Sequence, residues 1–369
     1  MKHPLHRPVL GDEELSALAE VLKSGHLVQG PRVAAFEARL AELLEIRHAV
    51  AVSSGTAALH VSAVAMGLTP HDEVIVPAFG FPATANAVEL TGARAVAADV
   101  DLERFALTVE SIEAVATERT VGVILVHPFG IPAPTPELKS LCDSRGWWLI
   151  EDAACALGTA QGTRWGTGAL PVCLSFHPRK TITTGEGGVI ATDDDELAER
   201  MRALRNHGMD PNATSWSRFS IAGFNYRMSD MSAAIGLVQL DRLEFIVSER
   251  RRITALYREA LAPLEGVRWP QGYDLADLSC QSMVVELSAD VDRDAVMAHL
   301  ADEGVQTTIG GYALSEQPYY RDRYGLRTED VPNASRFAQS CLTLPVTVEM
   351  TPEDVEEVVS ALRRAMESR

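Results

Sequence analysis

Apolar positions recur at helical spacing near the start of the chain. Residues 13 to 23 and 32 to 45 carry apolar side chains three and four positions apart, the spacing that gives a helix one apolar face. The first run begins at Gly11, Asp12, Glu13 and Glu14, and acidic residues at a helix start complement the helix dipole. The pattern predicts two amphipathic helices before the first strand.

Short apolar runs then alternate with helical segments. The runs are HAVAV, DEVIVPAF, ARAVAADVD, VGVILVHPFG and WWLIEDAA. The segments between them are an alanine-rich stretch after Ser-Ser-Gly-Thr, FPATANAVELTG ending at Gly92, and PTPELKSLCDSRG. Continuous apolar strands separated by helices are typical of a parallel sheet covered on both faces. An α/β fold is therefore expected.

The second half of the chain has a different pattern. Residues 229 to 262 keep helical periodicity without a break, which is long enough to leave one domain and enter another. The strand SMVVELSAD and helices near 292 to 303 and 352 to 367 follow. Because 369 residues are too many for one ordinary core, we expect a large α/β domain over 1–245 and a small α+β domain over 246–369.

Composition and charge limit the classes of partner that this chain is expected to bind. The formal net charge of -18 repels phosphate backbones and anionic lipid, so neither nucleic acid nor a membrane is an expected partner. No run approaches the roughly 20 apolar residues of a membrane span, and the start of the chain has no apolar signal core, so a cytoplasmic location is expected. The five cysteines form no CxxC pair, which argues against disulfides and a metal site.

Polar residues at the carboxyl ends of the strands are candidates for chemistry, since ligands bind there in open parallel sheets. Ser54, Gly55 and Thr56 lie where a strand gives way to a helix, which suits a phosphate but also suits a simple helix cap. Asp152, beside Glu151, closes a very apolar strand and needs a partner, or caps the next helix. Phe79 or Phe81 in PAFGFPATANA could lie on a planar ligand or in the core.

Lys180 is the most informative single residue. Only four of the 33 basic residues of the chain are lysine, and the neighbouring Arg179 is an arginine like most of the others. Lysine differs from arginine because its amine can lose its proton and condense with a carbonyl. Ser175 and His177 precede it, and the GEGG turn after it is neither a Walker loop nor part of a G-x-G-x-x-G fingerprint. A lysine with carbonyl chemistry is favoured over a nucleotide site.

These candidates together describe one ligand. A helix start for a phosphate, an aromatic for a planar ring, a buried acid for a pyridinium nitrogen and a lysine for an aldehyde are the requirements of pyridoxal 5'-phosphate (PLP). The order SSGTAAL, PAFGFPATANA, EDAA, SFHPRKTITTGEGG, RNHG and GFNYRMSDMSAAIGLVQL resembles the DegT/DnrJ/EryC1/StrS family of sugar aminotransferases, from about residue 8 onward. The resemblance implies an aspartate aminotransferase-like fold (PLP fold type I), with a mainly parallel seven-stranded sheet in the large domain.

The resemblance also implies roles for individual residues. Lys180 would bind the cofactor aldehyde and shuttle the substrate proton, Asp152 would hold the ring nitrogen, and Phe81 would stack on the ring. The phosphate would be held by four residues, Ser54, Gly55, Thr56 and Ser175. Asn225 would reach it from the other subunit of a homodimer whose active site lies at the interface.

The resemblance also bears on three further positions. Cys155 stands where relatives commonly have Gln or His against the ring hydroxyl, and a thiol is a weak donor. His177 braces the loop or contacts substrate, and Tyr312 is the candidate where relatives carry a substrate-facing His or Tyr.

The resulting hypothesis is an aminotransferase that moves an amino group from an amino acid, with glutamate as the expected donor, to a nucleotide-linked keto-hexose. A cyclitol or another ketone is an alternative acceptor. A PLP-dependent lyase or dehydratase is a rival on the same fold, although the dehydratases of the family have histidine in place of the lysine. A catalytically silent sensor or binding protein is the rival from a different class.

Overall fold

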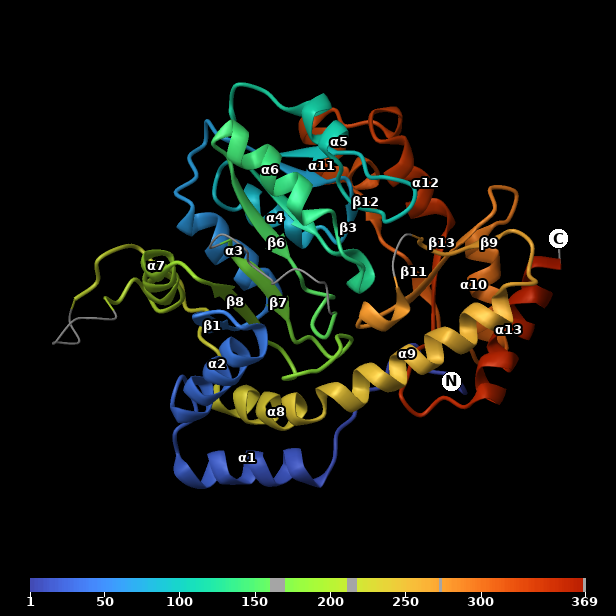
Figure 1. Cartoon of the computed structure of the whole chain (residues 1–369), viewed down its shortest axis with the longest axis horizontal. Helices are drawn as coiled ribbons and strands as arrows, with labels where there is room; N and C mark the ends of the chain where they lie inside the picture. Colours follow the sequence, from blue (N-terminus) through green and yellow to red (C-terminus); the bar gives the residue numbers. More distant parts are fainter. Residues whose placement is uncertain (160–169, 211–217, 272–273, 368–369) are drawn as a thin grey trace.

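The main sheet forms the centre of the molecule in the computed structural model, which describes residues 1–159, 170–210, 218–271 and 274–367 (Figure 1). Within these residues the sheet is seven-stranded, in the order β1 (His48–Val52), β8 (Gly188–Thr192), β7 (Val172–Ser175), β6 (Trp148–Asp152), β5 (Thr120–Val126), β2 (Glu73–Pro77) and β4 (Arg94–Ala98). Strands β4, β2, β5, β6 and β7 pair in parallel, whereas β8 is antiparallel to both of its neighbours. The expectation of a mainly parallel seven-stranded sheet is confirmed.

Helices cover both faces of this sheet because alternate strand residues point to opposite sides. Val74 and Val76 of β2 pack in one buried cluster with α3 (Gly55–Ala65), α4 (Ala83–Glu89) and α7 (Asp195–Arg205). Ile75, between them, packs on the other face against α5 (Val109–Val115) and α6 (Thr135–Arg145). Helix α2 (Pro31–Leu44) covers the β1 end of that second face, and α1 (Asp12–Ser24) lies outside it against α8 (Asp230–Asp241). Both amphipathic helices predicted at the start of the chain are present.

A second, smaller sheet lies in the C-terminal half. Its strands are antiparallel, in the order β11 (Thr308–Ile309), β13 (Cys341–Leu344), β10 (Met283–Leu287) and β9 (Val267–Arg268). The later part of α9 (Leu243–Leu261), α10 (Arg293–Asp302) and α13 (Pro352–Glu367) share a buried cluster with it. None of the helices in the described ranges is long and apolar enough to cross a membrane.

The long helix predicted over residues 229 to 262 is two helices. Arg242 separates α8 from α9, with φ -97° and ψ -3°. Its guanidinium is tied to the start of the chain, since Nη2 donates to Glu13 Oε2 at 2.7 Å and Nη1 donates to the carbonyl of Val9 at 3.3 Å. The continuous prediction was wrong because this break is set by contacts far away in the sequence. Helix α9 then runs from the main sheet's core to that of the smaller sheet (Figure 1).

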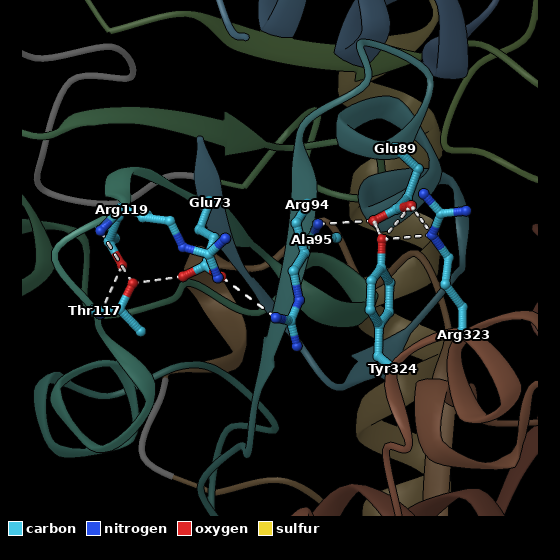
Figure 2. A network of polar contacts seen from close by, with 9 residues as sticks. Glu73, Glu89, Arg94, Ala95, Thr117, Arg119, Arg323 and Tyr324 are labelled. Atoms are coloured by element: carbon cyan, nitrogen blue, oxygen red, sulfur yellow. Dashed lines mark hydrogen bonds and ion pairs between the residues drawn. The ribbon is translucent and has the colours of Figure 1, made fainter. Parts of the chain in front are cut away.

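The chain returns from the small sheet to the large one near residue 312. There β12 (Tyr312–Ala313) pairs with β3 (Phe79–Gly80), and α11 (Pro318–Tyr324) docks on α4. Glu89 accepts a hydrogen bond from the hydroxyl of Tyr324 at 2.7 Å (Figure 2). It accepts another from the hydroxyl of Tyr319 at 2.9 Å. Helix α12 (Pro332–Ser340) packs beside β12. The segment 79–89 is therefore held between the main sheet and the C-terminal half.

A buried acid lies at the amino end of β2, away from the segment 79–89. Glu73, which opens β2, accepts from Thr117 Oγ1 at 2.5 Å and pairs with Arg94 and Arg119 (Figure 2). Arg94 also lies over the ring of Tyr324, with its guanidinium carbon 4.7 Å from the ring centroid. The charge of a nearly inaccessible carboxylate is thus compensated by two guanidinium groups, away from the candidate site.

Candidate active site

Several of the predicted functional residues lie at the ends of neighbouring strands on one side of the main sheet. Gly188, the first residue of β8, pairs with Val52 at the end of β1 and with Ser175 at the end of β7. Asp152, the last residue of β6, pairs with Cys173 of β7. The loops that leave these strand ends carry Ser54, Lys180 and Cys155, so the carboxyl edge of the sheet gathers groups that are far apart in the sequence.

The loop carrying Lys180 is fixed by its own hydrogen bonds. Between β7 and β8 the backbone of Phe176 donates to the carbonyl of Gly187 at 2.9 Å, and its carbonyl accepts from Thr183 Oγ1 at 2.9 Å. The backbone N–H of Lys180 donates to the carbonyl of His177 at 2.8 Å. Because the loop's polar backbone is satisfied internally, it holds the Lys180 side chain in a half-buried position.

Lys180 reaches the loop that follows β6. Its Nζ lies 3.0 Å from the Sγ of Cys155 and donates a hydrogen bond to it. Cys155 is half-buried. The thiol therefore lies beside the amine.

Asp152 is the buried acid of the site. Its side chain is inside the protein, where Oδ2 accepts from Thr84 Oγ1 at 2.7 Å and Oδ1 accepts from the N–H of Ala154 at 3.2 Å. Burial raises the pKa of Asp152 above its usual value, and the hydrogen bonds from Thr84 and Ala154 and the nearby charge of Lys180 act in the opposite direction. A carboxylate in this position is stabilised by any further cationic group. Thr84 was missed in the sequence, although it is a hydroxyl in an otherwise apolar helix start.

Glu151 belongs to the other face of the sheet. His127 Nδ1 accepts from the N–H of Ala133 at 3.1 Å, which leaves Nε2 as the protonated nitrogen, 3.1 Å from Glu151 Oε2. Both side chains are buried. The partner that the sequence required for this acid is therefore a histidine that also donates its backbone N–H to the carbonyl of Asp152, at 3.1 Å.

The start of α3 is packed tightly onto the ends of β7 and β8. Ser54 caps the helix, since its Oγ accepts from the N–H of Ala57 at 3.0 Å, which is the alternative role considered for it. A Cβ at Gly55 would lie 2.6 Å from Ser175 Cβ, and one at Gly188 would lie 2.3 Å from the carbonyl oxygen of Ser54. Only glycine permits this approach. The N–H groups of Gly55 and Thr56, unsatisfied within the helix as at any helix start, therefore lie beside the Ser175 residue.

Two aromatic rings lie at the border of the site. Pairing of β12 with β3 brings Tyr312 next to Phe81, with ring centroids 6.0 Å apart in an edge-on arrangement. The Phe81 side chain is 64% exposed, whereas the neighbouring Phe79 is buried among other phenylalanines. Of the two phenylalanines weighed in the sequence, only Phe81 is therefore available to a ligand.

Within the described residues, neither His177 nor Asn225 forms a hydrogen bond with the side chain of Lys180. Nδ1 of His177 accepts from the N–H of Arg179 at 3.2 Å, and burial lowers the pKa of His177, so a bracing role in the loop fits its contacts. Asn225 is exposed and forms an isolated bridge with Asn206.

Comparisons with known proteins identify the family of this chain. Residues 8–363 match the model of the DegT/DnrJ/EryC1/StrS aminotransferase family. The chain is similar to the aminotransferase TlmJ of Streptoalloteichus hindustanus, at 35% identity over 99% of each chain with a TM-score of 0.91. It is also similar to DesV of S. venezuelae, solved with a ketimine intermediate, at 32% identity over 97% of this chain and 95% of DesV, with a TM-score of 0.90.

A third similar structure is that of an enzyme from a biosynthetic pathway. PseC of Helicobacter pylori, an aminotransferase involved in the biosynthesis of pseudoaminic acid, is 25% identical over the full length of both chains, with a TM-score of 0.93. The match to the family model covers nearly the whole chain, and Lys180 and Asp152 lie in one site at the edge of the sheet. The chain thus belongs to the DegT/DnrJ/EryC1/StrS aminotransferase family and is a PLP-dependent aminotransferase.

Proposed function

We propose that this enzyme transfers an amino group from L-glutamate to the ketone of a nucleotide-linked hexose. The observation that carries the proposal is the half-buried amine of Lys180 at the same sheet edge as the buried carboxylate of Asp152 and the start of α3. The role of PseC in the biosynthesis of pseudoaminic acid supports a sugar as acceptor. The family and the relatives do not define donor or nucleotide, so both are part of the proposal.

The residues at this edge fit PLP on two independent counts. The deeply buried Asp152 accepts hydrogen bonds from the neutral Thr84 hydroxyl and Ala154 N–H, so a protonated ring nitrogen would add a hydrogen-bonded cation to this carboxylate. The close packing of Gly55 on Ser175 and of Gly188 on Ser54 sets the start of α3 beside the ends of β7 and β8, and the backbone N–H groups of a helix start suit a phosphate. We infer that Ser54, Gly55, Thr56 and Ser175 hold the phosphate and that Phe81 covers the ring.

Each protein group then has a limited task. PLP, when bound, supplies an electron sink and carries the amino group between the two half-reactions. Lys180 would attach the cofactor through its amine and move the proton at the reacting substrate carbon. Asp152 would keep the ring nitrogen protonated, and the loop hydrogen bonds of Phe176 and Thr183 would keep Lys180 in reach. Tyr312, beside Phe81, is proposed to contact the acceptor.

Replacing Thr84 with valine is expected to weaken PLP binding roughly tenfold, the effect of losing one hydrogen bond to a charged group. The hydrogen bond from the Thr84 hydroxyl lowers the pKa of Asp152, so this pKa rises in the variant. As pH falls, the Asp152 carboxylate of the variant is therefore protonated at a higher pH than that of the parent. Affinity should therefore fall more steeply as pH decreases. PLP dissociation constants measured against pH test this, with Thr84→Ser as the variant that restores binding. An unchanged pH dependence in the valine variant would contradict the role.

We also propose a homodimer in which Asn225 completes the neighbouring site. Exposed apolar side chains lie on segments that pair with one another: Val28 bridges to Ser229, and Phe219 bridges to Met209. Leu27 and Ile221 extend this exposed apolar surface, and Asn225 lies on the same strand-like segment. Exposed apolar side chains on neighbouring segments suit an interaction site, and a two-fold dimer would carry each Asn225 toward its partner.

Hybrid dimers test the shared site. Lys180→Ala and Asn225→Ala homodimers are each expected to be nearly inactive, whereas co-expression should restore about a quarter of the wild-type sites, because one site per hybrid then has both residues intact. Turnover by the co-expressed mixture, with each homodimer as control, is the measurement. No recovery despite verified hybrid formation would place Asn225 in its own subunit's site or outside the site.

The acceptor is tested by offering ketones to enzyme already loaded with the amino group from glutamate. Nucleotide-linked 4-keto and 3-keto hexoses and a keto-cyclitol would be compared, with the aminated product followed by mass spectrometry. The proposal expects amination of a nucleotide-linked sugar. Amination of the cyclitol alone would move the acceptor to the non-nucleotide ketones and overturn that part of the proposal.

A further inference from the structure

Cys155 differs from the other cysteines of the chain. All five lie in the part of the chain that the structure describes, and four of them, Cys142, Cys173, Cys280 and Cys341, are buried. Cys155 alone among them is half-exposed, and it alone has the amine of a lysine in contact, with 3.0 Å between Lys180 Nζ and its Sγ. Oxidation of thiols follows exposure and a cationic neighbourhood. An oxidant entering the site would therefore meet Cys155 first.

The contact between the two side chains is held by a third segment. Ser279 Oγ donates to the carbonyl of Cys155 at 3.1 Å, and Gln281 Nε2 donates to the carbonyl of Arg179 at 2.8 Å. Arg250 of α9 in turn donates to the carbonyl of Gln281 at 2.8 Å. Residues 279–281 thus tie the Cys155 loop and the Lys180 loop to one helix, so the short distance between thiol and amine is built into the fold.

We propose that Cys155 and Lys180 form a reversible covalent link when the cofactor-free enzyme meets a hydroperoxide. The thiol sulfur attacks the peroxide, the O–O bond breaks, and Cys155 becomes a sulfenic acid while the peroxide leaves as an alcohol or water. The amine nitrogen then attacks this sulfur, an N–S bond forms, the S–O bond breaks, and water leaves. The product lacks two hydrogen atoms relative to the starting thiol and amine.

The link has a direct consequence for cofactor capture. While its nitrogen is bonded to sulfur, Lys180 has no free amine for the aldehyde of PLP. Two thiol molecules reverse it: the first attacks the Cys155 sulfur and releases the amine, and the second releases Cys155 as a thiol. Bound PLP occupies the amine, so the loaded enzyme should resist. The inference goes beyond the proposed transfer reaction and does not depend on its acceptor.

The test uses the full-length protein with and without PLP, treated with one equivalent of hydrogen peroxide. The cofactor-free protein is expected to lose two hydrogen atoms in its intact mass, to give a cross-linked peptide containing positions 155 and 180, and to recover after thiol treatment. The loaded protein should show neither change. Oxygen added to Cys155 without a cross-link, or an equal cross-link in the loaded protein, would overturn the proposal.

Matched variants locate the chemistry. Cys155→Ser should form no link, and Cys142→Ser should behave as the wild type because its thiol is buried. Lys180→Ala should stop at the sulfenic acid, which a dione probe would label. A link that persists in Cys155→Ser, or a Lys180→Ala protein that still loses two hydrogen atoms, would assign the event to another pair. These readouts are masses, so they do not depend on whether the enzyme accepts a sugar.

Discussion

Lys180→Ala is expected to lose at least about 10³-fold in turnover, the range of a group that transfers the reacting proton, and to lose its covalent hold on PLP entirely. The physical reason is that the side chain supplies both the amine that condenses with the aldehyde and the base at the substrate carbon. Single-turnover product formation from glutamate measures the first loss. The visible absorption band of lysine-bound PLP measures the second.

Lys180→Arg is the control that separates charge from chemistry. Arginine keeps the positive charge beside Cys155 and Asp152, but its guanidinium does not deprotonate and cannot condense with the aldehyde. The arginine variant should therefore be as inactive as the alanine variant. Substantial turnover with arginine would mean that position 180 needs only a cation, which would remove its proposed role.

Asp152→Asn is expected to retain PLP while losing roughly 10²- to 10³-fold in kcat, the size of losing one preorganised electrostatic contact. The amide can still meet the ring nitrogen but cannot keep it protonated. Comparing kcat with the PLP dissociation constant distinguishes this from a binding defect. A variant that turns over like the parent would show that another group is the partner of the ring nitrogen.

The Asp152→Asn substitution, which is expected to lower kcat, is expected to raise the stability of the cofactor-free protein. Because burial raises the pKa of Asp152, the folded state holds that proton more tightly than the unfolded state, and the contribution to stability is lost as pH rises through the folded pKa. Cofactor-free Asp152→Asn should therefore be more stable than the parent at neutral pH, with the difference shrinking in acid. Thermal unfolding at two pH values measures it. A less stable variant at neutral pH would mean that Thr84 and Ala154 already compensate the charge.

The central parts of the fold and site could be predicted because they are local in the sequence. The apolar runs between residues 48 and 154 predict the parallel sheet, and Asp152 is predicted as a site residue because it is an acid at the end of the apolar strand WWLIED. Lys180 stands out in a chain that otherwise prefers arginine. Each of these signals lies within a few residues of the feature it predicts.

The remainder depends on contacts between distant segments. Thr84 meets Asp152 only because α4 packs beside the end of β6, and Tyr312 meets Phe81 only through the pairing of β12 with β3. The break at Arg242 is set by Val9 and Glu13. The contact between Lys180 and Cys155 joins two loops whose spacing is fixed by residues 279–281. No local pattern reports such distances.

The visible absorption spectrum of the purified enzyme with PLP, taken before and after adding L-glutamate, is the decisive measurement for amino-group transfer through Lys180. We predict a band of PLP held by Lys180, which disappears on addition of glutamate while 2-oxoglutarate is formed in equal amount. A band that responds to glutamine or another amino acid instead would replace the donor. A band that no amino acid removes would contradict the assignment of Lys180 and Asp152 to amino-group transfer.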